Sequence, residues 1–118
     1  MAVRIKRIYE PAMAADGSRI LVDRLWPRGV SKARAKLALW MKDVAPSPKL
    51  RVWFGHRPER FREFSRRYKK ELTGNADLGE LRKLARRERV TLLYGAHDPK
   101  INHAAVLQAI LRGKTSRR

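Results

Sequence analysis

The sequence predicts an α/β fold, a single domain with a small, mostly parallel sheet of about four strands flanked by helices. Three observations support this prediction. Short apolar segments rich in β-branched residues alternate with segments of about ten to fifteen residues whose apolar side chains recur at helical spacing. The 118 residues are 43% hydrophobic, enough for one core. No repeat or linker divides residues 1–113, and we expect the basic residues 114–118 to form a disordered tail.

Two strands are predicted at the start of the chain. Residues 3–9 alternate apolar and basic side chains with a period of two, as in a half-buried strand, and Pro11 ends this pattern. After an Asp-Gly turn, residues 18–23 are expected to form a second short strand of buried type. Pro27 and the glycine that follows it then break the chain, so residues 24–29 are expected to form a loop.

The middle of the chain is predicted to hold two short helices and an ambiguous segment. Ser31 can cap a helix that runs to about residue 37. Residues 37–41 are apolar throughout, a pattern that does not distinguish strand from helix. Ser47 followed by proline indicates another helix start, because serine accepts a free amide and proline fits the first helical position. This helix is expected to end at Gly55.

Two amphipathic helices, a strand and an apolar helix are predicted for the remainder. The first helix runs from residue 58 to Gly74. Its apolar side chains recur at spacings of three and four, at Phe61, Phe64, Tyr68 and Leu72. Asp77 is the expected cap of the second helix, which ends near residue 88. Residues 90–94 are expected to form a buried strand, and residues 102–111 an apolar helix that ends at Gly113.

The absence of cysteine excludes several kinds of chemistry. This chain has no disulfide, zinc–thiolate site, iron–sulfur cluster or cysteine nucleophile. Its longest apolar run, residues 37–41, is far shorter than the roughly 18–20 residues that span a bilayer. Residues 1–10 mix charged and apolar side chains, unlike a secretory signal peptide. We therefore expect a cytoplasmic protein with no membrane partner.

The formal net charge is +18, from 29 Lys and Arg against 11 Asp and Glu. This excess is spread along the chain, with +8 in residues 1–56, +6 in 57–89 and +4 in 90–118. A nucleic-acid-binding element usually concentrates its cations. Two segments do so: one helix, at Arg82, Lys83, Arg86, Arg87 and Arg89, and the tail, at Lys114, Arg117 and Arg118. A solvated helix face is the simpler interpretation, although the total charge predicts weak, salt-sensitive binding of nucleic acid.

Candidate ligand-binding residues follow the second predicted strand. Asp23, Arg24, Trp26 and Arg28 lie in one short loop, and ligands of open α/β sheets bind at the carboxyl ends of strands. Arginine binds carboxylate or phosphate, and tryptophan can stack on a planar group. Alternatively, Trp26 packs in the core and Asp23 pairs with one of the two arginines. The sequence leaves both interpretations open.

A second candidate set follows the last predicted strand. A turn of small residues leads into a helix N-terminus there, which is a candidate anion site that Tyr94, Asp98, Asn102 and His103 would line. The simpler interpretation is that Asp98 or Asn102 caps the helix. His103, His56 or Tyr94 would supply any general acid or base. The three histidines lack the spacing of a metal site, so neither a metal nor a cofactor is predicted.

Five ordered blocks carry a resemblance to a known family. The blocks are residues 22–29; Trp40, Lys42, Asp43, Ala45, Pro46 and Ser47; Leu50, Arg51, Trp53, Phe54 and His56; Phe64, Tyr68, Glu71 and Leu72; and Thr91, Leu92, Leu93, Tyr94, Ala96, Asp98, Asn102, Ala104, Val106 and Leu107. On these blocks the sequence resembles the YeaO-like branch of a bacterial and archaeal domain-of-unknown-function family, DUF488.

The resemblance implies one shared pocket, formed by Asp23, Arg24, Trp26, Arg28, Tyr94, Asp98 and Asn102. The wider family has a cysteine-containing loop after its last strand, placed like the active loop of rhodanese-like sulfur-transfer domains. This chain has Gly-Ala-His at residues 95–97, so sulfur transfer through a thiolate is excluded. His97 also stands where the resemblance leads us to expect lysine.

Two functions are therefore expected. The first is binding of a small anionic or planar ligand in a pocket between residues 23–29 and 95–102, with no reaction assigned. In this pocket Arg24 and Arg28 would bind the anion and Trp26 would form a stacking wall. The alternative is a basic, nucleic-acid-associated module without sequence specificity.

Overall fold

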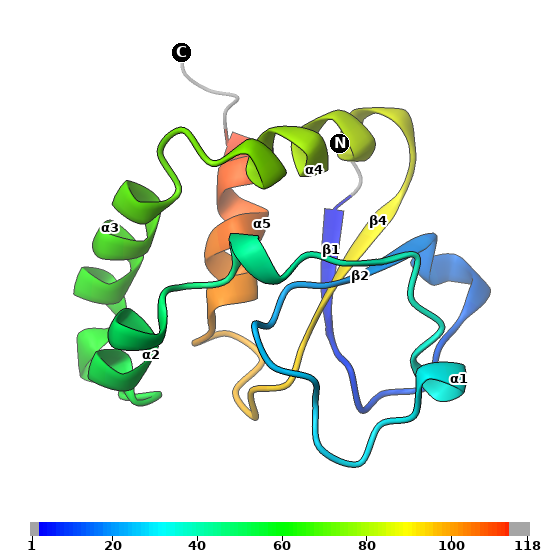
Figure 1. Cartoon of the computed structure of the whole chain (residues 1–118), viewed down its shortest axis with the longest axis horizontal. Helices are drawn as coiled ribbons and strands as arrows, with labels where there is room; N and C mark the ends of the chain where they lie inside the picture. The colour runs from blue at the N-terminus through cyan, green and yellow to red at the C-terminus, as the bar shows by residue number, and fades with distance from the viewer. Residues whose placement is uncertain (1–2, 114–118) are drawn as a thin grey trace.

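The four strands form one parallel sheet, which confirms the predicted α/β class. The computed structural model describes residues 3–113 of the chain. Strands β1 (Val3–Arg7), β2 (Ser18–Leu21), β3 (Leu39–Trp40) and β4 (Val90–Tyr94) lie in the order β1-β4-β2-β3 (Figure 1). The last strand in sequence is therefore central, with β1 and β2 on either side of it. The tail at residues 114–118 lies outside the described residues, so its predicted disorder stays a prediction.

Strand β4 is central because its five side chains are all buried. In a parallel sheet, strands covered on both faces read as continuous apolar runs. Val3 and Ser18 both pair with Val90, so β1 and β2 start level with β4. Regular pairing ends earlier than the sequence predicts, at residues 7 and 21, because the chain then leaves the sheet toward two loops. The ambiguous segment at residues 37–41 contains the edge strand β3.

Residues 3–113 hold five helices: α1 (Lys32–Ala35), α2 (Pro48–Phe54), α3 (Phe61–Glu71), α4 (Ala76–Arg87) and α5 (His103–Gly113), the last of which follows β4. Single 3-10 turns lie at Ala14–Asp16, Lys42–Val44 and Pro58–Arg60. The last of these replaces the first turn of the helix that the sequence predicts from residue 58. Among residues 3–113, none of these helices has the length and apolar character needed to cross a bilayer.

The helix starts follow from side-chain caps. Ser31 accepts the Arg34 amide at 3.0 Å, and Ser47 accepts the Leu50 amide at 3.1 Å, as predicted. The prediction that Asp77 caps α4 is wrong. Asn75 is the cap instead, because its Oδ1 accepts the amide of Leu78 at 2.9 Å. Asp77 lies in the first turn, where a carboxylate still interacts favourably with the helix dipole.

The two faces of the sheet are covered differently. Alternate residues of β2 and β4, including Ile20 and Leu92, pack with side chains of α2, α3, α4 and α5 in the larger core. Leu21 and Leu93 point to the other face, where a smaller core is closed by Trp26 and Trp40. That second face is covered by α1 and irregular chain rather than by long helices (Figure 1). Among residues 3–113, side chains of the long helices are therefore available at the carboxyl ends of the strands on one face of the sheet only.

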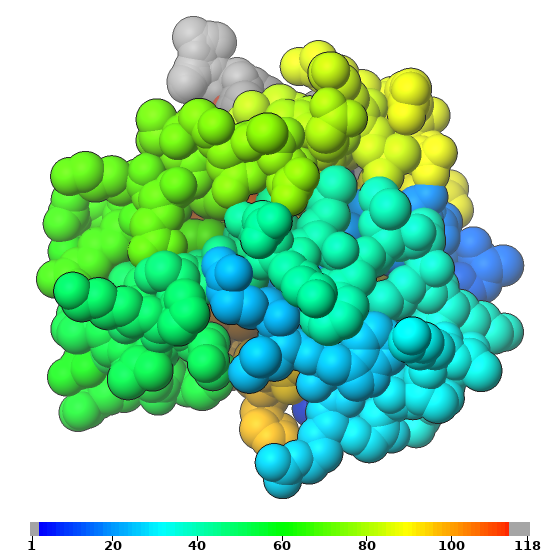
Figure 2. Space-filling view, in the orientation of Figure 1, coloured from blue at the N-terminus to red at the C-terminus, as the bar shows by residue number. Residues whose placement is uncertain are grey.

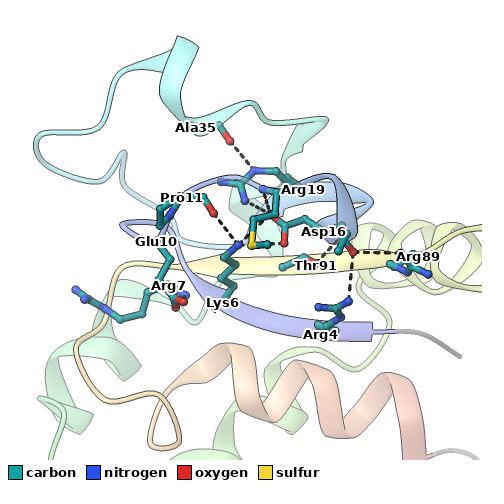
Figure 3. Close-up of polar contacts among 12 residues, drawn as sticks. Arg4, Lys6, Arg7, Glu10, Pro11, Asp16, Arg19, Ala35, Arg89 and Thr91 are labelled. Atoms are coloured by element: carbon teal, nitrogen blue, oxygen red, sulfur yellow. Dashed lines mark hydrogen bonds and ion pairs between the residues drawn. The ribbon is translucent and has the colours of Figure 1, made fainter.

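A buried polar network fixes the connection from β1 to β2 on the second face (Figure 3). Asp16 is 2% exposed, and its carboxylate lies 2.6 Å from Arg19 Nη1 and 3.1 Å from Lys6 Nζ. Thr91 donates to the Asp16 carbonyl, and Arg19 donates to the carbonyl of Ala35. The network satisfies these buried groups and joins β1, β2 and β4 to the connection.

Candidate functional site

A cavity of about 530 Å³ lies at the carboxyl ends of β2 and β4, on the helical side of the sheet. Its wall is built from the segment after β2, from α2 and the turn that follows it, and from the loop between β4 and α5. These segments meet around the opening in Figure 2, where they are blue, green and orange. The position agrees with the rule that ligands of open α/β sheets bind at strand carboxyl ends.

Asp23 connects the loops that follow β2 and β4. Its Oδ2 accepts the Gly95 amide at 2.9 Å, and its Oδ1 lies 3.1 Å from Nε2 of His103. The same Nε2 lies 3.0 Å from the carbonyl oxygen of Val22. Because both neighbours are acceptors, Nε2 must carry a proton. That proton points to Val22, so Oδ1 receives no hydrogen bond from any described residue and interacts with the imidazole only by proximity.

Arg24 places a positive charge at the mouth of the cavity. Its guanidinium donates to the carbonyls of Pro46 at 3.3 Å and Ala45 at 3.1 Å, which connects the segment after β2 to the start of α2. Asp43 lies 3.9 Å from Nη1 but is 79% exposed, so this ion pair is weak. The Arg24 side chain is 30% exposed and lines the cavity, so its charge acts on any bound anion.

The loop between β4 and α5 is held by its own polar side chains. Asp98 accepts the amides of Lys100 and Ile101 at 2.8 and 2.9 Å, and these hydrogen bonds lower the pKa of its carboxyl. Asn102 accepts the Ala105 amide at 2.8 Å as the cap of α5 and donates to the carbonyl of Asp98 at 2.7 Å. The simpler interpretation of these two residues, helix and loop capping, is therefore what the structure shows.

Three of the predicted ligand-binding residues do not line the cavity. Trp26 donates to the Val30 carbonyl at 2.6 Å, and its ring lies edge-on to Trp40 at 5.2 Å in the smaller core. Arg28 is exposed, with its side chain away from the cavity wall. Tyr94 is 2% exposed in the larger core, where burial raises the pKa of its phenol. Asp23, Arg24, Asp98, Asn102 and His103 do line one cavity.

The separation of Trp26 from the cavity has a physical reason. After β2, side chains only a few residues apart lie on opposite faces of the sheet. Arg24 turns toward α2, whereas Trp26 fills the space beside Trp40 and Leu21 on the other face. Closeness in sequence therefore did not imply a shared pocket.

Sequence reasoning did not assign Arg51 to the site and considered His56 only as an acid or base. Both side chains line the cavity, and within residues 3–113 neither makes a hydrogen bond or an ion pair. The stacked rings of Phe54 and Phe64, 4.2 Å apart, form an apolar part of the wall. Arg51 and Phe54 are three residues apart on α2, which places them on the same face of the helix, and this spacing could have indicated the wall.

No group of three or more His, Asp and Glu side chains in the described part of the chain is arranged to hold a metal ion. The cations proposed for nucleic-acid binding lie elsewhere, on α4 at the opposite end of the molecule from the β4–α5 loop (Figure 1). Lys83 pairs with Glu80 at 3.4 Å, and Arg89 donates to the Ala15 carbonyl at 3.3 Å. Arg86 and Arg87 are exposed.

Comparison with known proteins identifies the family. A family model described as the inactive DUF488-N3 subclade matches residues 2–118. The chain belongs to the DUF488 family. It is 42% identical to the uncharacterized protein YeaO of Escherichia coli over 113 residues, which cover 95% of this chain and 98% of YeaO. It is 48% identical to the uncharacterized protein Rv3073c of Mycobacterium tuberculosis over 112 residues, 95% of either chain.

An uncharacterized protein of Mycobacterium bovis, Mb3100c, shows the same 48% identity over 112 residues. These relatives confirm that the chain is a YeaO-like member of the DUF488 family. No solved structure matches this DUF488 chain.

Proposed function

We propose that this DUF488 protein binds a small organic anion with an apolar body in the cavity beside Asp23. The proposal depends on one observation: some polar side chains of the wall are hydrogen-bonded to the protein backbone, and others are not. Asp23, Asp98 and Asn102 are already engaged by backbone groups of the same loops. Asp23 Oδ1 accepts no hydrogen bond from any described residue but lies 3.1 Å from Nε2 of His103. The whole side chains without such partners are basic or imidazole groups, among them Arg51 and His56. A ligand that satisfies the free groups is therefore an anion.

The apolar wall indicates the second property of the ligand. Phe54 and Phe64 are 4% and 1% exposed and lie beside Ala45, Pro46 and Ala96 in the lining. Ligand pockets typically combine such apolar surface with a few placed polar groups that fix orientation. A compact apolar or planar group would rest on this wall while the charged group of the ligand faces Arg24 and Arg51.

Binding without turnover is the form of this proposal that the site supports. Nε2 of His103 hydrogen-bonds to the Val22 carbonyl, and Tyr94 is buried and does not line the cavity. Neither group is thus presented as a proton donor through these atoms. The family description, which calls the subclade inactive, points in the same direction.

Benzoate tests the proposal, because it combines one carboxylate with a planar apolar ring. We expect titration of the ¹⁵N-labelled protein to shift amide resonances of residues 23–25, 51–56 and 95–98 in a saturable manner. Arg51→Gln should weaken binding about tenfold, the effect of removing one charge-assisted hydrogen bond. Arg28→Gln removes an equal charge outside the cavity and should leave the affinity unchanged. Equal weakening by both substitutions, or shifts scattered over the surface, would contradict the proposal.

A second candidate function is non-specific binding of nucleic acid at α4. The observation that favours it is the exposed pair Arg86 and Arg87, for which the described residues provide no ion pair. Lys83 and Arg89 flank the pair but are partly engaged by Glu80 and the Ala15 carbonyl. Counterion release from phosphates would drive this binding, so its signature is a steep dependence on salt.

A further inference from the structure

The turn after α2 holds His56 in an unusual backbone conformation. Gly55 ends α2 with φ of +52°, and His56 continues the left-handed path with φ of +59°. The left-handed region is disfavoured for side chains with a Cβ, and glycine would adopt it freely. Lys36, at the end of α1, is the one other non-glycine residue with positive φ among residues 3–113.

The imidazole of His56 makes no polar interaction with the described residues that would offset the energetic cost of this backbone conformation. It makes no hydrogen bond or ion pair within the described chain, and its ring contact is a tilted one with Phe54 at 6.0 Å. Most of the residue is exposed, yet the side chain lines the cavity. Residues held in sparsely populated backbone regions concentrate at ligand sites, where the strain serves to position a side chain.

The donors around the cavity exceed what one carboxylate can use. A single arginine fork can satisfy both oxygens of a carboxylate. Here Arg24 and Arg51 approach from separate segments, and the imidazoles of His56 and His97 add further nitrogens. The carboxylates of Asp23 and Asp98 also line the wall, but backbone amides bind Asp98 and Oδ2 of Asp23, and Oδ1 of Asp23 lies beside the imidazole of His103. A phosphate group, with three terminal oxygens and up to two charges, matches this set better.

We propose that the ligand of this cavity is an organic phosphate, and that His56 is a specificity residue that contacts its phosphate group. This inference rests on the proposed function and specifies the class of its ligand. The turn accepts a strained backbone because that conformation places an imidazole on the cavity wall, which Arg51 also lines. The selectivity of the site for phosphate over carboxylate then depends on His56, whereas its general affinity for anions depends on Arg24 and Arg51.

Phenyl phosphate and benzoate form a matched pair of probes, since both have one phenyl ring and they differ in the anionic group. We expect isothermal titration calorimetry to show at least tenfold tighter binding of phenyl phosphate to the unaltered protein, equal to about 1.4 kcal/mol. His56→Asn keeps a residue that tolerates positive φ but lacks the imidazole. This variant, and His56→Gly, should bind the two probes with nearly equal affinity.

Thermal unfolding tests the strain independently. His56→Gly should raise the Tm by about 4 °C, because glycine relieves the left-handed strain. Lys36→Gly is the matched control: it should raise the Tm similarly, but leave the preference for phenyl phosphate intact because Lys36 lies outside the cavity. A Tm that does not rise in His56→Gly would overturn the argument from strain.

The outcomes separate this inference from the function on which it rests. Equal affinity of the unaltered protein for both probes would overturn the phosphate class and leave anion binding in place. Retention of the phosphate preference in both His56 variants would remove His56 from the site. Failure of both probes to bind would overturn the proposed function and this inference together.

Discussion

The buried carboxyl of Asp16 makes the stability of the connection between β1 and β2 depend on pH. Burial by itself would raise the pKa of this carboxyl, but hydrogen bonds from the Met13 amide, Lys6 and Arg19 outweigh it, and the pKa lies below its ordinary value. A carboxyl whose pKa is lowered by folding stabilises the native state above its unfolded pKa. That contribution begins to decline as the pH falls below about 4, the ordinary pKa of an aspartate, and it is lost once the pH has fallen through the lower native pKa.

Asp16→Asn should lower the free energy of unfolding by about 2–3 kcal/mol at pH 7, because it leaves Arg19 and Lys6 without their carboxylate partner. Urea denaturation between pH 7 and pH 2 measures the effect. The gap between the variant and the unaltered protein should narrow as the pH falls below 4. Glu80→Gln, which removes one member of an exposed pair, should cost less than about 0.5 kcal/mol at any pH. A gap that does not change with pH would contradict the assignment.

At the scale of the element, two helices begin with asparagine caps that have different consequences. Asn102 starts α5 and also binds the β4–α5 loop through the Asp98 carbonyl. Asn75 starts α4 and donates to the carbonyl of Asp43, and neither of these two residues lines the cavity. Each amide satisfies one backbone group of its helix and one of a neighbouring segment. Of the two caps, only Asn102 itself lines the candidate site.

Asn102→Ala and Asn75→Ala should each destabilise the protein by about 1–2 kcal/mol, the usual effect of losing a cap. Chemical denaturation provides this measurement. Only Asn102→Ala should also weaken benzoate binding, since it releases the loop that carries Asp98. If Asn75→Ala weakened binding to the same degree, global destabilisation would be the cause and the loop would have no separate role.

The elements differ in how far sequence could predict them. Ser31 and Ser47 mark helix starts because a cap is a local interaction, whereas the choice between Asn75 and Asp77 depends on where the preceding chain turns. The segment at residues 37–41 carried no period, and pairing with β2 made part of it a strand. Local patterns therefore predicted which elements exist, and tertiary pairing determined their ends.

At the scale of the whole molecule, topology predicted the location of the candidate site better than its members. Parallel strands place their carboxyl ends together, so Asp23 and Asp98 were expected to meet and do line one cavity. Trp26 was expected there too, but the demand for apolar cover on the second face draws it away. Arg51 joins from α2, where its spacing to Phe54 was a weak sequence signal for this wall. Whether these residues bind a ligand stays a prediction.

The net charge of +18 also acts at this scale. Fluorescence anisotropy with single-stranded DNA should show weak binding whose log affinity falls linearly with log salt. If α4 contacts phosphates, Arg86→Gln combined with Arg87→Gln should reduce the slope by roughly 1.4, about 0.7 for each contact. The matched control combines Arg28→Gln with Lys36→Gln and should leave the slope unchanged. Equal slopes in both variants would indicate a diffuse field and remove α4 as a site.

The central position of β4 determines when the sheet can form as the chain is synthesised. Val3 and Ser18 both pair with Val90, and within residues 3–113 β4 is the one strand beside β1. A nascent chain that still lacks β4 can form only the two-residue contact between β2 and β3. The apolar strands β1 and β2 therefore lack their shared neighbour β4 until residues 90–94 are present, and such non-local pairing is slow. During synthesis, β1 and β2 can therefore join one sheet only after β4 has left the ribosome.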